Sequence, residues 1–114
     1  MRNQLGIHVN GREVLCYDRS AGVPGRRRQF LAQMDRDMDE GIRLGGQAIV
    51  NPDTRQRARY VAMQLLHALE TGNQHLAETL CAWLATQLPE LQALHAVEAD
   101  DTVTVDFDFG TTGN

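Results

Sequence analysis

The sequence predicts an α+β fold in the order β-β-α-α-α-β, and three observations lead to this prediction. Residues 5–17 are predicted to form a β-hairpin around an Asn-Gly turn. Residues 51–94 carry the helical spacing of an antiparallel helix pair. Residues 102–109 alternate between apolar and polar side chains, which is typical of a half-buried strand. We expect this C-terminal strand to join the hairpin in a small antiparallel sheet that helices cover on one face.

The composition is that of an ordinary globular protein, with 42% hydrophobic and 23% charged residues. A chain of 114 residues can form one core, so we expect a single domain over residues 1–109 and a disordered tail at 110–114. The sequence has no apolar run of about 18 residues that would span a membrane. It also has no apolar signal core near its N-terminus. We therefore expect a cytoplasmic protein without a cofactor.

The hairpin is predicted from Asn10-Gly11, the strongest short hairpin signal in the sequence. A two-residue turn there would set His8 opposite Glu13 as an ion pair. The same register predicts three further cross-strand pairs: Val9–Arg12, Ile7–Val14 and Leu5–Cys16. One face of the hairpin would then be apolar and the other polar, as a half-buried sheet requires.

A loop over residues 18–25 leads into an amphipathic helix that we predict from about Gln29 to Leu44. Its apolar face consists of Phe30, Leu31, Met34, Met38 and Ile42. Arg26-Arg27-Arg28 come at or just before its start, where cations oppose the helix dipole. This local conflict requires either an extended approach to the helix or an anionic partner.

The helix pair has well-marked ends. Asn51 is predicted to cap the first helix, with Pro52 at the first helical position and Asp53 in the first turn. Gly72 is predicted to end that helix at a positive φ, and Asn73 to cap the second. The first helix has an apolar face formed by Ala58, Val61, Ala62, Leu65, Leu66 and Leu69.

The second helix of the pair has an apolar arc wide enough to pack against two neighbours. The arc comprises Leu76, Ala77, Leu80, Trp83, Leu84 and Leu88, with Cys81 at its edge. Pro89 should end or kink this helix because it removes a donor and clashes with the previous turn. We expect one or two further helical turns to restart there and to run through Leu94.

Two metal motifs are incomplete in the sequence. Residues 35–46 begin like a calcium loop, but Glu40 replaces the required glycine and Gly46 the bidentate acid. Helical spacing runs through this segment, where Asp39 and Arg43 would pair across one turn. The set His67, His75, His95 and Cys81 has no paired zinc-ligand spacing. We therefore expect no metal.

Charge is distributed unevenly along the chain, which has a net charge of −4. Residues 1–34 carry six Arg and two acids, whereas residues 35–114 carry five Arg and thirteen acids. The candidate anion-binding residues are Arg26, Arg27, Arg28, Arg55 and Arg59. If Arg26–Arg28 and the pair Arg55 and Arg59 lie close together in the fold, they would form a patch for nucleic acid or another anion. The alternative is that they are solvated and paired with acids.

A second candidate surface lies on the helix pair. Tyr60, Met63 and His67 follow one another on the side of the first helix away from its core face, and Trp83 lies in the wide arc of the second. Aromatic and methionine side chains are enriched in protein interfaces. The alternative is that they pack against the sheet or the preceding helix.

Three functions remain open. We favour a non-catalytic protein–protein interaction or regulatory module, as a homodimer or an accessory subunit, because no nucleophile, phosphate-binding or dinucleotide motif is present. The second is a nucleic-acid or anion binder that uses the arginines. The third is a small enzyme whose site forms at an oligomer interface.

Overall fold

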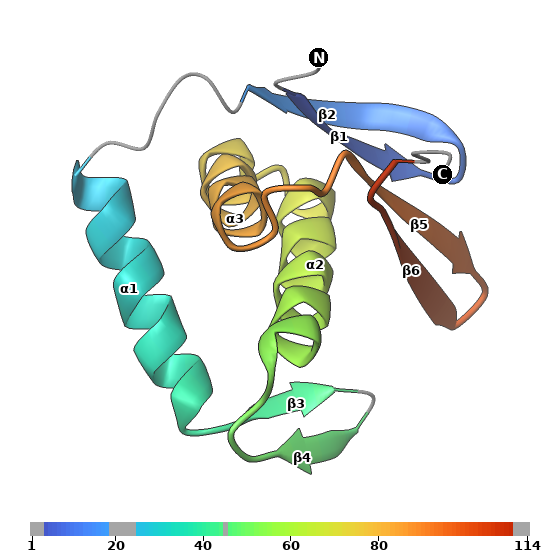
Figure 1. Cartoon of the computed structure of the whole chain (residues 1–114). Coiled ribbons are helices and arrows are strands. Elements are labelled where there is room, and N and C mark those ends of the chain that lie inside the picture. Colours follow the sequence, from blue (N-terminus) through green and yellow to red (C-terminus); the bar gives the residue numbers. More distant parts are fainter. Residues whose placement is uncertain (1–3, 19–24, 45, 111–114) are drawn as a thin grey trace.

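The computed structural model of the protein describes residues 4–18, 25–44 and 46–110. It confirms the α+β class (Figure 1). The elements are β1 (Gln4–Val9), β2 (Arg12–Asp18), α1 (Gly25–Asp39), β3 (Ile42–Leu44), β4 (Gln47–Ile49), α2 (Thr54–Glu70), α3 (Gln74–Gln87), β5 (Ala93–Ala99) and β6 (Thr102–Asp108). The order differs from the predicted one because it also contains the β3–β4 hairpin and the strand β5. Of the loop predicted over residues 18–25, Asp18 ends β2 and Gly25 begins α1, and residues 19–24 lie outside the described residues. Residues 111–114 of the tail predicted over 110–114 also lie outside them.

The main sheet has the strand order β2-β1-β5-β6. We expected the C-terminal strand to pair with the N-terminal hairpin. This is wrong, because β5 lies between β6 and the hairpin. β5 pairs with β1 in parallel and with β6 in antiparallel orientation, so the sheet is mixed rather than antiparallel. The predicted helical restart through Leu94 is wrong, since Leu94 and Ala96 alternate along β5 and bury their side chains.

The N-terminal hairpin contains a β-bulge that changes the predicted register. Asn10 and Gly11 form the turn with φ of 51° and 83°, and His8 is opposite Glu13 as predicted. The register then shifts between Ile7 and His8. The partners beyond the shift are Ile7–Leu15, Gly6–Cys16 and Leu5–Tyr17. The extra residue is Val14, and Tyr17 is consequently buried while Cys16 is exposed.

The first helix begins and ends earlier than predicted. α1 includes Arg26, Arg27 and Arg28 in its first turns and ends at Asp39. Gly41 follows with a φ of +132°, a value that a helix cannot contain, and Ile42 then pairs with Ile49 in the β3–β4 hairpin. The predicted Asp39–Arg43 helical pair is therefore wrong.

The helix pair is confirmed, but its first cap differs. Asp53, not Asn51, is the N-cap of α2, and it forms a capping box with Gln56. At the other end, Gly72 has a φ of +77°, and the side chain of Asn73 accepts a hydrogen bond from the backbone N–H of Leu76 at 3.2 Å, as predicted.

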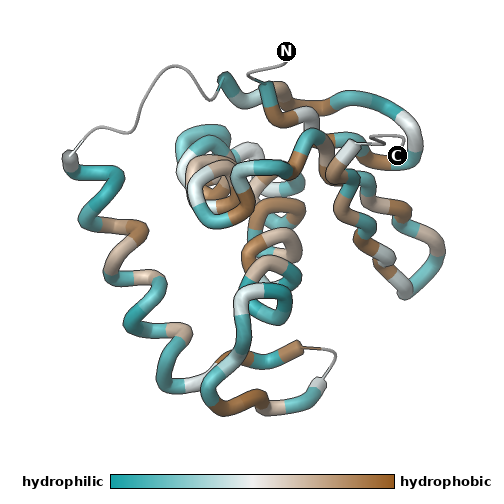
Figure 2. Tube along the Cα trace, in the orientation of Figure 1, coloured by the Kyte–Doolittle hydropathy of each residue, from teal (hydrophilic) through white to brown (hydrophobic). Residues whose placement is uncertain are grey.

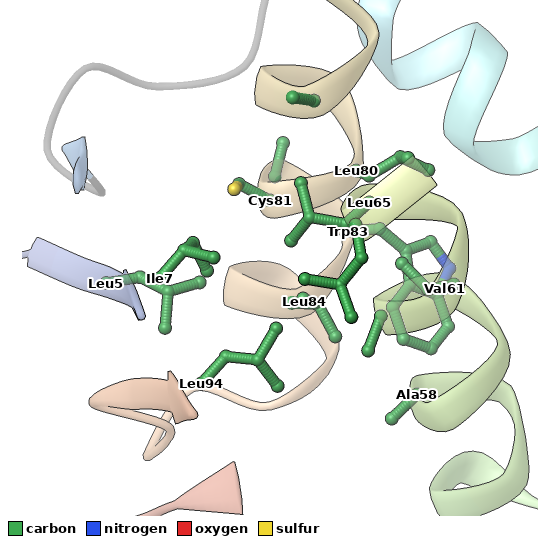
Figure 3. Packing of buried hydrophobic residues seen from close by; sticks show 14 of the residues in the cluster. Leu5, Ile7, Ala58, Val61, Leu65, Leu80, Cys81, Trp83, Leu84 and Leu94 are labelled. Atoms are coloured by element: carbon green, nitrogen blue, oxygen red, sulfur yellow. The ribbon is translucent and has the colours of Figure 1, made fainter. Parts of the chain in front are cut away.

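The core lies between the sheet and the helix pair. Figure 3 shows Leu5, Ile7 and Leu94 of the sheet pointing toward α3, where Leu84 and Cys81 lie. All five side chains are 0% exposed. α2 and α3 lie between the sheet and α1 (Figure 1), so the wide apolar arc of α3 has neighbours on both sides. In the described part of the chain, no helix is both long enough and apolar enough to cross a membrane.

α1 is attached differently from the helix pair. It is mainly hydrophilic along its length, with isolated apolar positions, whereas α2 and α3 carry denser apolar stretches (Figure 2). Leu31 and Met38 are its buried residues, and Met34 is partly buried. This small apolar contact makes the polar bridges between α1 and the helix pair important for its position.

Candidate interaction surface

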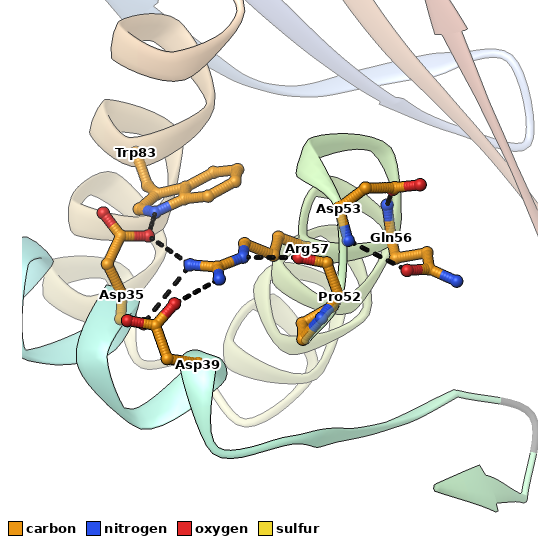
Figure 4. A network of polar contacts seen from close by, with 7 residues as sticks. All are labelled: Asp35, Asp39, Pro52, Asp53, Gln56, Arg57 and Trp83. Atoms are coloured by element: carbon orange, nitrogen blue, oxygen red, sulfur yellow. Dashed lines mark hydrogen bonds and ion pairs between the residues drawn. The ribbon is translucent and has the colours of Figure 1, made fainter. Parts of the chain in front are cut away.

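A polar network centred on Arg57 joins α1 to the helix pair (Figure 4). The guanidinium of Arg57 donates to the carbonyl oxygen of Pro52 at 3.1 Å and to that of Asp35 at 3.3 Å. It also forms ion pairs with the carboxylates of Asp35, at 3.6 Å, and Asp39. The indole N–H of Trp83 donates to Oδ1 of Asp35 at 2.9 Å. The carboxylate of Asp35 on α1 therefore contacts both the guanidinium of Arg57 on α2 and the indole N–H of Trp83 on α3.

This network corrects one predicted site residue. Trp83 is 1% exposed and its only polar atom is hydrogen-bonded to Asp35, so it belongs to the core and not to a partner surface. The sequence placed it in an apolar arc but gave no sign of the polar partner, because Asp35 lies on a helix distant along the chain. Buried Trp N–H groups normally have such a partner.

The predicted anion patch is divided over three regions. Arg26 and Arg27 line a hollow of about 470 Å³ between the starts of α1 and α3. Arg28 lines a different hollow beside Trp83, and Arg59 lines a third hollow beside β6. At about 1.5 Å rise per residue, Arg27 lies roughly 18 Å along α1 from Asp39. Asp39 pairs with Arg57 in the first turn of α2. The start of α2, with Arg55, therefore lies near one end of α1, and Arg26 and Arg27 lie near the other end.

The remaining predicted partner residues also separate. Tyr60 is partly buried and lines a hollow against the β3–β4 hairpin. Arg55 and His67 are exposed. Met63 is 40% exposed and contributes to the hollow beside β6. Of the predicted stripe, Tyr60 and Met63 therefore lie beside apolar residues, but in two different hollows.

The hollow beside β6 has a volume of about 330 Å³. We call it the β6–α2 hollow, and it is lined by Leu44, Arg59, Met63, Val103 and Val105. Val103 is 39% exposed although it shares a strand face with Val105, which is 5% exposed. The alternating pattern of residues 102–109 predicted that face correctly but could not show that its outer end would be left uncovered.

A chain of polar side chains crosses the opposite face of the sheet. The rings of His8 and His95 stack with centroids 4.8 Å apart. His8 Nε2 lies 3.8 Å from Glu13 Oε1, and His95 Nε2 lies 3.5 Å from Asp108 Oδ2. A Cβ at Gly6 would lie 3.1 Å from His8 Nε2, so the absence of a side chain there makes room for the ring. These contacts join all four strands.

Three groups in or next to the sheet have shifted pKa values, and the first is Tyr17, whose pKa is raised by burial. The backbone N–H of Gly110 donates to Asp108 Oδ1 at 2.8 Å and, together with His95, lowers the pKa of the Asp108 carboxyl. Burial, with the nearby charges of Glu78 and Cys16, raises the pKa of the Cys81 thiol from 9.0 to about 12. Cys81 therefore keeps its proton at neutral pH and is not an activated nucleophile.

Within residues 4–18, 25–44 and 46–110, no group of three or more His, Cys, Asp or Glu side chains is placed to hold a metal ion. Comparison of the chain with protein-family models, curated proteins and solved structures found no match. One surface where exposed apolar side chains adjoin an outer strand is the edge of β6 beside the β6–α2 hollow.

Proposed function

We propose that the protein is a non-catalytic protein–protein interaction or regulatory module that acts as a homodimer. The observation that supports this proposal is the grouping of exposed apolar residues beside a sheet edge. Met63 and Val103 are 40% and 39% exposed and line the same hollow, next to the last strand in the sheet order. Scattered exposed apolar residues are normal, but contiguous ones next to an open edge mark interaction sites.

Light scattering coupled to size-exclusion chromatography tests this proposal directly. We expect a mass of about twice 12.7 kDa at micromolar concentration, with dissociation on dilution. Met63→Lys should shift the equilibrium toward monomer, because it places a charge among the apolar groups of the hollow. Gln64→Lys is the matched control, since Gln64 is an exposed neighbour on α2. A wild-type mass of one chain at all concentrations would contradict the proposal.

A second candidate is anion binding at the hollow between the starts of α1 and α3. Arg26, Arg27 and His75 line it together with the apolar side chains of Phe30 and Leu76. Phe30 is 46% exposed, which provides an aromatic surface beside the two guanidinium groups. This arrangement suits an anion that carries an apolar or aromatic portion, such as a nucleotide base with its phosphate.

Arg26 is the residue to substitute at this hollow, because Arg27 is paired with an acid. Arg27 Nη2 lies 4.0 Å from Glu78 Oε1, so part of its charge is already balanced. We expect single-stranded oligonucleotide binding to weaken steeply with salt, and Arg26→Ala to weaken it further. Arg12→Ala, on the exposed start of β2, is the control. Absence of binding at low salt would remove this candidate.

A further inference from the structure

The geometry points to a specific contact between two copies of the chain: antiparallel pairing of β6 with β6 of the second copy, centred on Val105. This inference rests on the proposed homodimer and names the strand and register that form it. The result would be one continuous sheet across both copies.

The two edges of the main sheet differ in how they are protected. β2 and β6 are its outer strands. β2 carries the bulge at Val14, and bulges discourage pairing at an edge. β6 pairs with β5 over seven consecutive positions without irregularity, so no bulge interrupts its edge. In the described part of the chain, no strand pairs with the other side of β6.

The free backbone groups of β6 can be assigned from its neighbours. The carbonyl of Ala96 accepts a hydrogen bond from the N–H of Asn10 at 2.8 Å, so the backbone groups of Ala96 point toward β1. Ala96 is opposite Val105. Antiparallel pairs alternate between bonded and non-bonded, so Val105 points its N–H and C=O away from β5. The same holds for Val103 and Phe107, two positions to either side.

The register follows from the side chains. With Val105 opposite itself, Thr104 is opposite Asp106 of the second copy, so the Thr104 hydroxyl can donate to that carboxylate. Thr102 is opposite Asp108, and its hydroxyl already donates to the carbonyl of Ala99 at 2.8 Å. The inner face then pairs Val103 with Phe107 on both sides of the central valines. No acid is opposite an acid.

Neighbouring registers are less favourable. A register must keep inner side chains on the inner face, so the residue that lies opposite itself moves along β6 by whole residues. A centre at Asp106 places that carboxylate opposite its own copy, and like charges opposite each other are destabilising. A centre at Thr104 leaves Phe107 and Asp108 beyond the end of the second copy's β6, so that only residues 102–106 of each strand can pair. The centre at Val105 pairs all seven residues of β6 and places no acid opposite an acid.

The apolar surface agrees with this arrangement. Two copies that pair antiparallel at one edge are related by a two-fold axis perpendicular to the sheet, so the same faces lie on the same side. The β6–α2 hollows of both copies therefore lie on the helix side, next to the joined strands. Val103 and Met63, which are exposed in the single chain, would be covered there.

Disulfide trapping tests the register. One cysteine is introduced per variant, as Thr102→Cys, Thr104→Cys or Asp106→Cys, in a Cys16→Ser background, where the other remaining cysteine is the buried Cys81. Pairs of variants are mixed at equal concentration and oxidised mildly. Positions 104 and 106 form a non-bonded pair in the proposed register, with Cα atoms about 4.5 Å apart, which suits a disulfide.

We expect the mixture of Thr104→Cys with Asp106→Cys to form a cross-linked heterodimer at least tenfold faster than the other two mixtures. Faster linking of Thr102→Cys with Asp106→Cys would indicate a centre at Thr104. Faster linking of Thr102→Cys with Thr104→Cys would indicate a centre at Val103. Either result overturns the proposed register.

A proline variant tests whether the β6 edge is used at all. Val103→Pro removes an N–H that β5 does not use, and proline is tolerated at edge strands when that N–H faces solvent. We expect a monomer with an unchanged circular dichroism spectrum, whereas Val103→Thr remains a dimer. A different result is that the wild type and Val103→Pro are both dimers and positions 104 and 106 do not cross-link. The homodimer would then be correct, but β6 would not be the strand that forms it. A monomeric wild type overturns both.

Discussion

His8 stacks on His95 at the position where β1 and β5 pair in parallel, with ring centroids 4.8 Å apart and an interplanar angle of 28°. Each ring also faces a carboxylate of an outer strand, Glu13 on β2 and Asp108 on β6. The contact therefore links the N-terminal hairpin to the C-terminal hairpin at the only parallel pairing of the described sheets.

A double-mutant cycle should detect this contact as a coupling energy. We expect His8→Ala and His95→Ala to be less destabilising together than the sum of their separate effects, by about 0.2–1 kcal/mol, the usual range for cross-strand pairs. Urea unfolding followed by circular dichroism provides the free energies. The cycle of His8→Ala with His75→Ala, a distant exposed residue on α3, should be additive.

The lowered pKa of Asp108 predicts a pH dependence of stability. A carboxyl whose pKa is lower in the folded than in the unfolded chain stabilises the fold above its ordinary value of 3.8, and this contribution is lost as the pH falls through the folded value. The wild type should therefore lose more stability below about pH 4 than Asp108→Asn does. Thermal unfolding between about pH 6 and pH 2.5 provides the comparison, with Asp101→Asn in the exposed β5–β6 turn as control. Parallel curves for wild type and Asp108→Asn would contradict the assignment.

Loss of the Arg57 network should loosen α1. Arg57→Ala removes hydrogen bonds to two backbone carbonyls and ion pairs to two carboxylates. We expect a loss of about 1–2 kcal/mol in the free energy of unfolding, since hydrogen bonds to charged groups contribute most and exposed ion pairs little. Arg55→Ala, an exposed arginine on the same helix, should change stability by less than about 0.5 kcal/mol.

Faster amide hydrogen exchange in α1 should accompany the Arg57→Ala change. α1 has few buried apolar residues, so the polar bridges contribute a large share of its attachment. Exchange that rises equally in α2 and α3 would instead indicate a general loss of stability.

The two cysteines should differ in reactivity. Cys16 is exposed and Cys81 is buried. We expect one thiol per chain to react with a thiol reagent in the native protein, and none in Cys16→Ser. Complete unfolding should release the second thiol. Rapid labelling of Cys81 in native Cys16→Ser would contradict its burial.

The raised pKa of Cys81 also predicts a loss of stability in alkali. The unfolded chain ionises this thiol above about pH 9, while the folded chain keeps the proton until about pH 12. Stability should therefore fall between pH 9 and pH 12, by at most about 1.4 kcal/mol per pH unit from this group. Urea unfolding at pH 8, 9 and 10 should show a smaller decline in Cys81→Ala than in Cys16→Ser.

Part of the candidate surface could be predicted from the sequence. Met63 was predicted on the side of its helix away from the core, and the face of β6 that carries Val103 and Val105 was predicted from alternation. What could not be predicted is that these two sets lie together, because their proximity depends on where β6 is placed relative to α2. The exposed edge of β6 depends on the strand order, which no local pattern contains.

The sequence by itself determined the features that neighbouring residues control. The turn at Asn10-Gly11, the end of α2 at Gly72 and the cap at Asn73 follow from backbone preferences that act over a few residues. The buried faces of α2 and α3 follow from helical spacing, which is also local.

Only the tertiary structure decided the features that depend on distant partners. β5 exists as a strand because β1 and β6 supply hydrogen bonds on both of its sides. The bulge at Val14 turns Tyr17 inward, and the carboxylate of Asp35 pairs with the buried indole of Trp83, 48 residues away along the chain. Each of these contacts forms between segments far apart in the sequence. Their energies therefore depend on the packing of the whole chain and leave no short-range pattern from which to predict them.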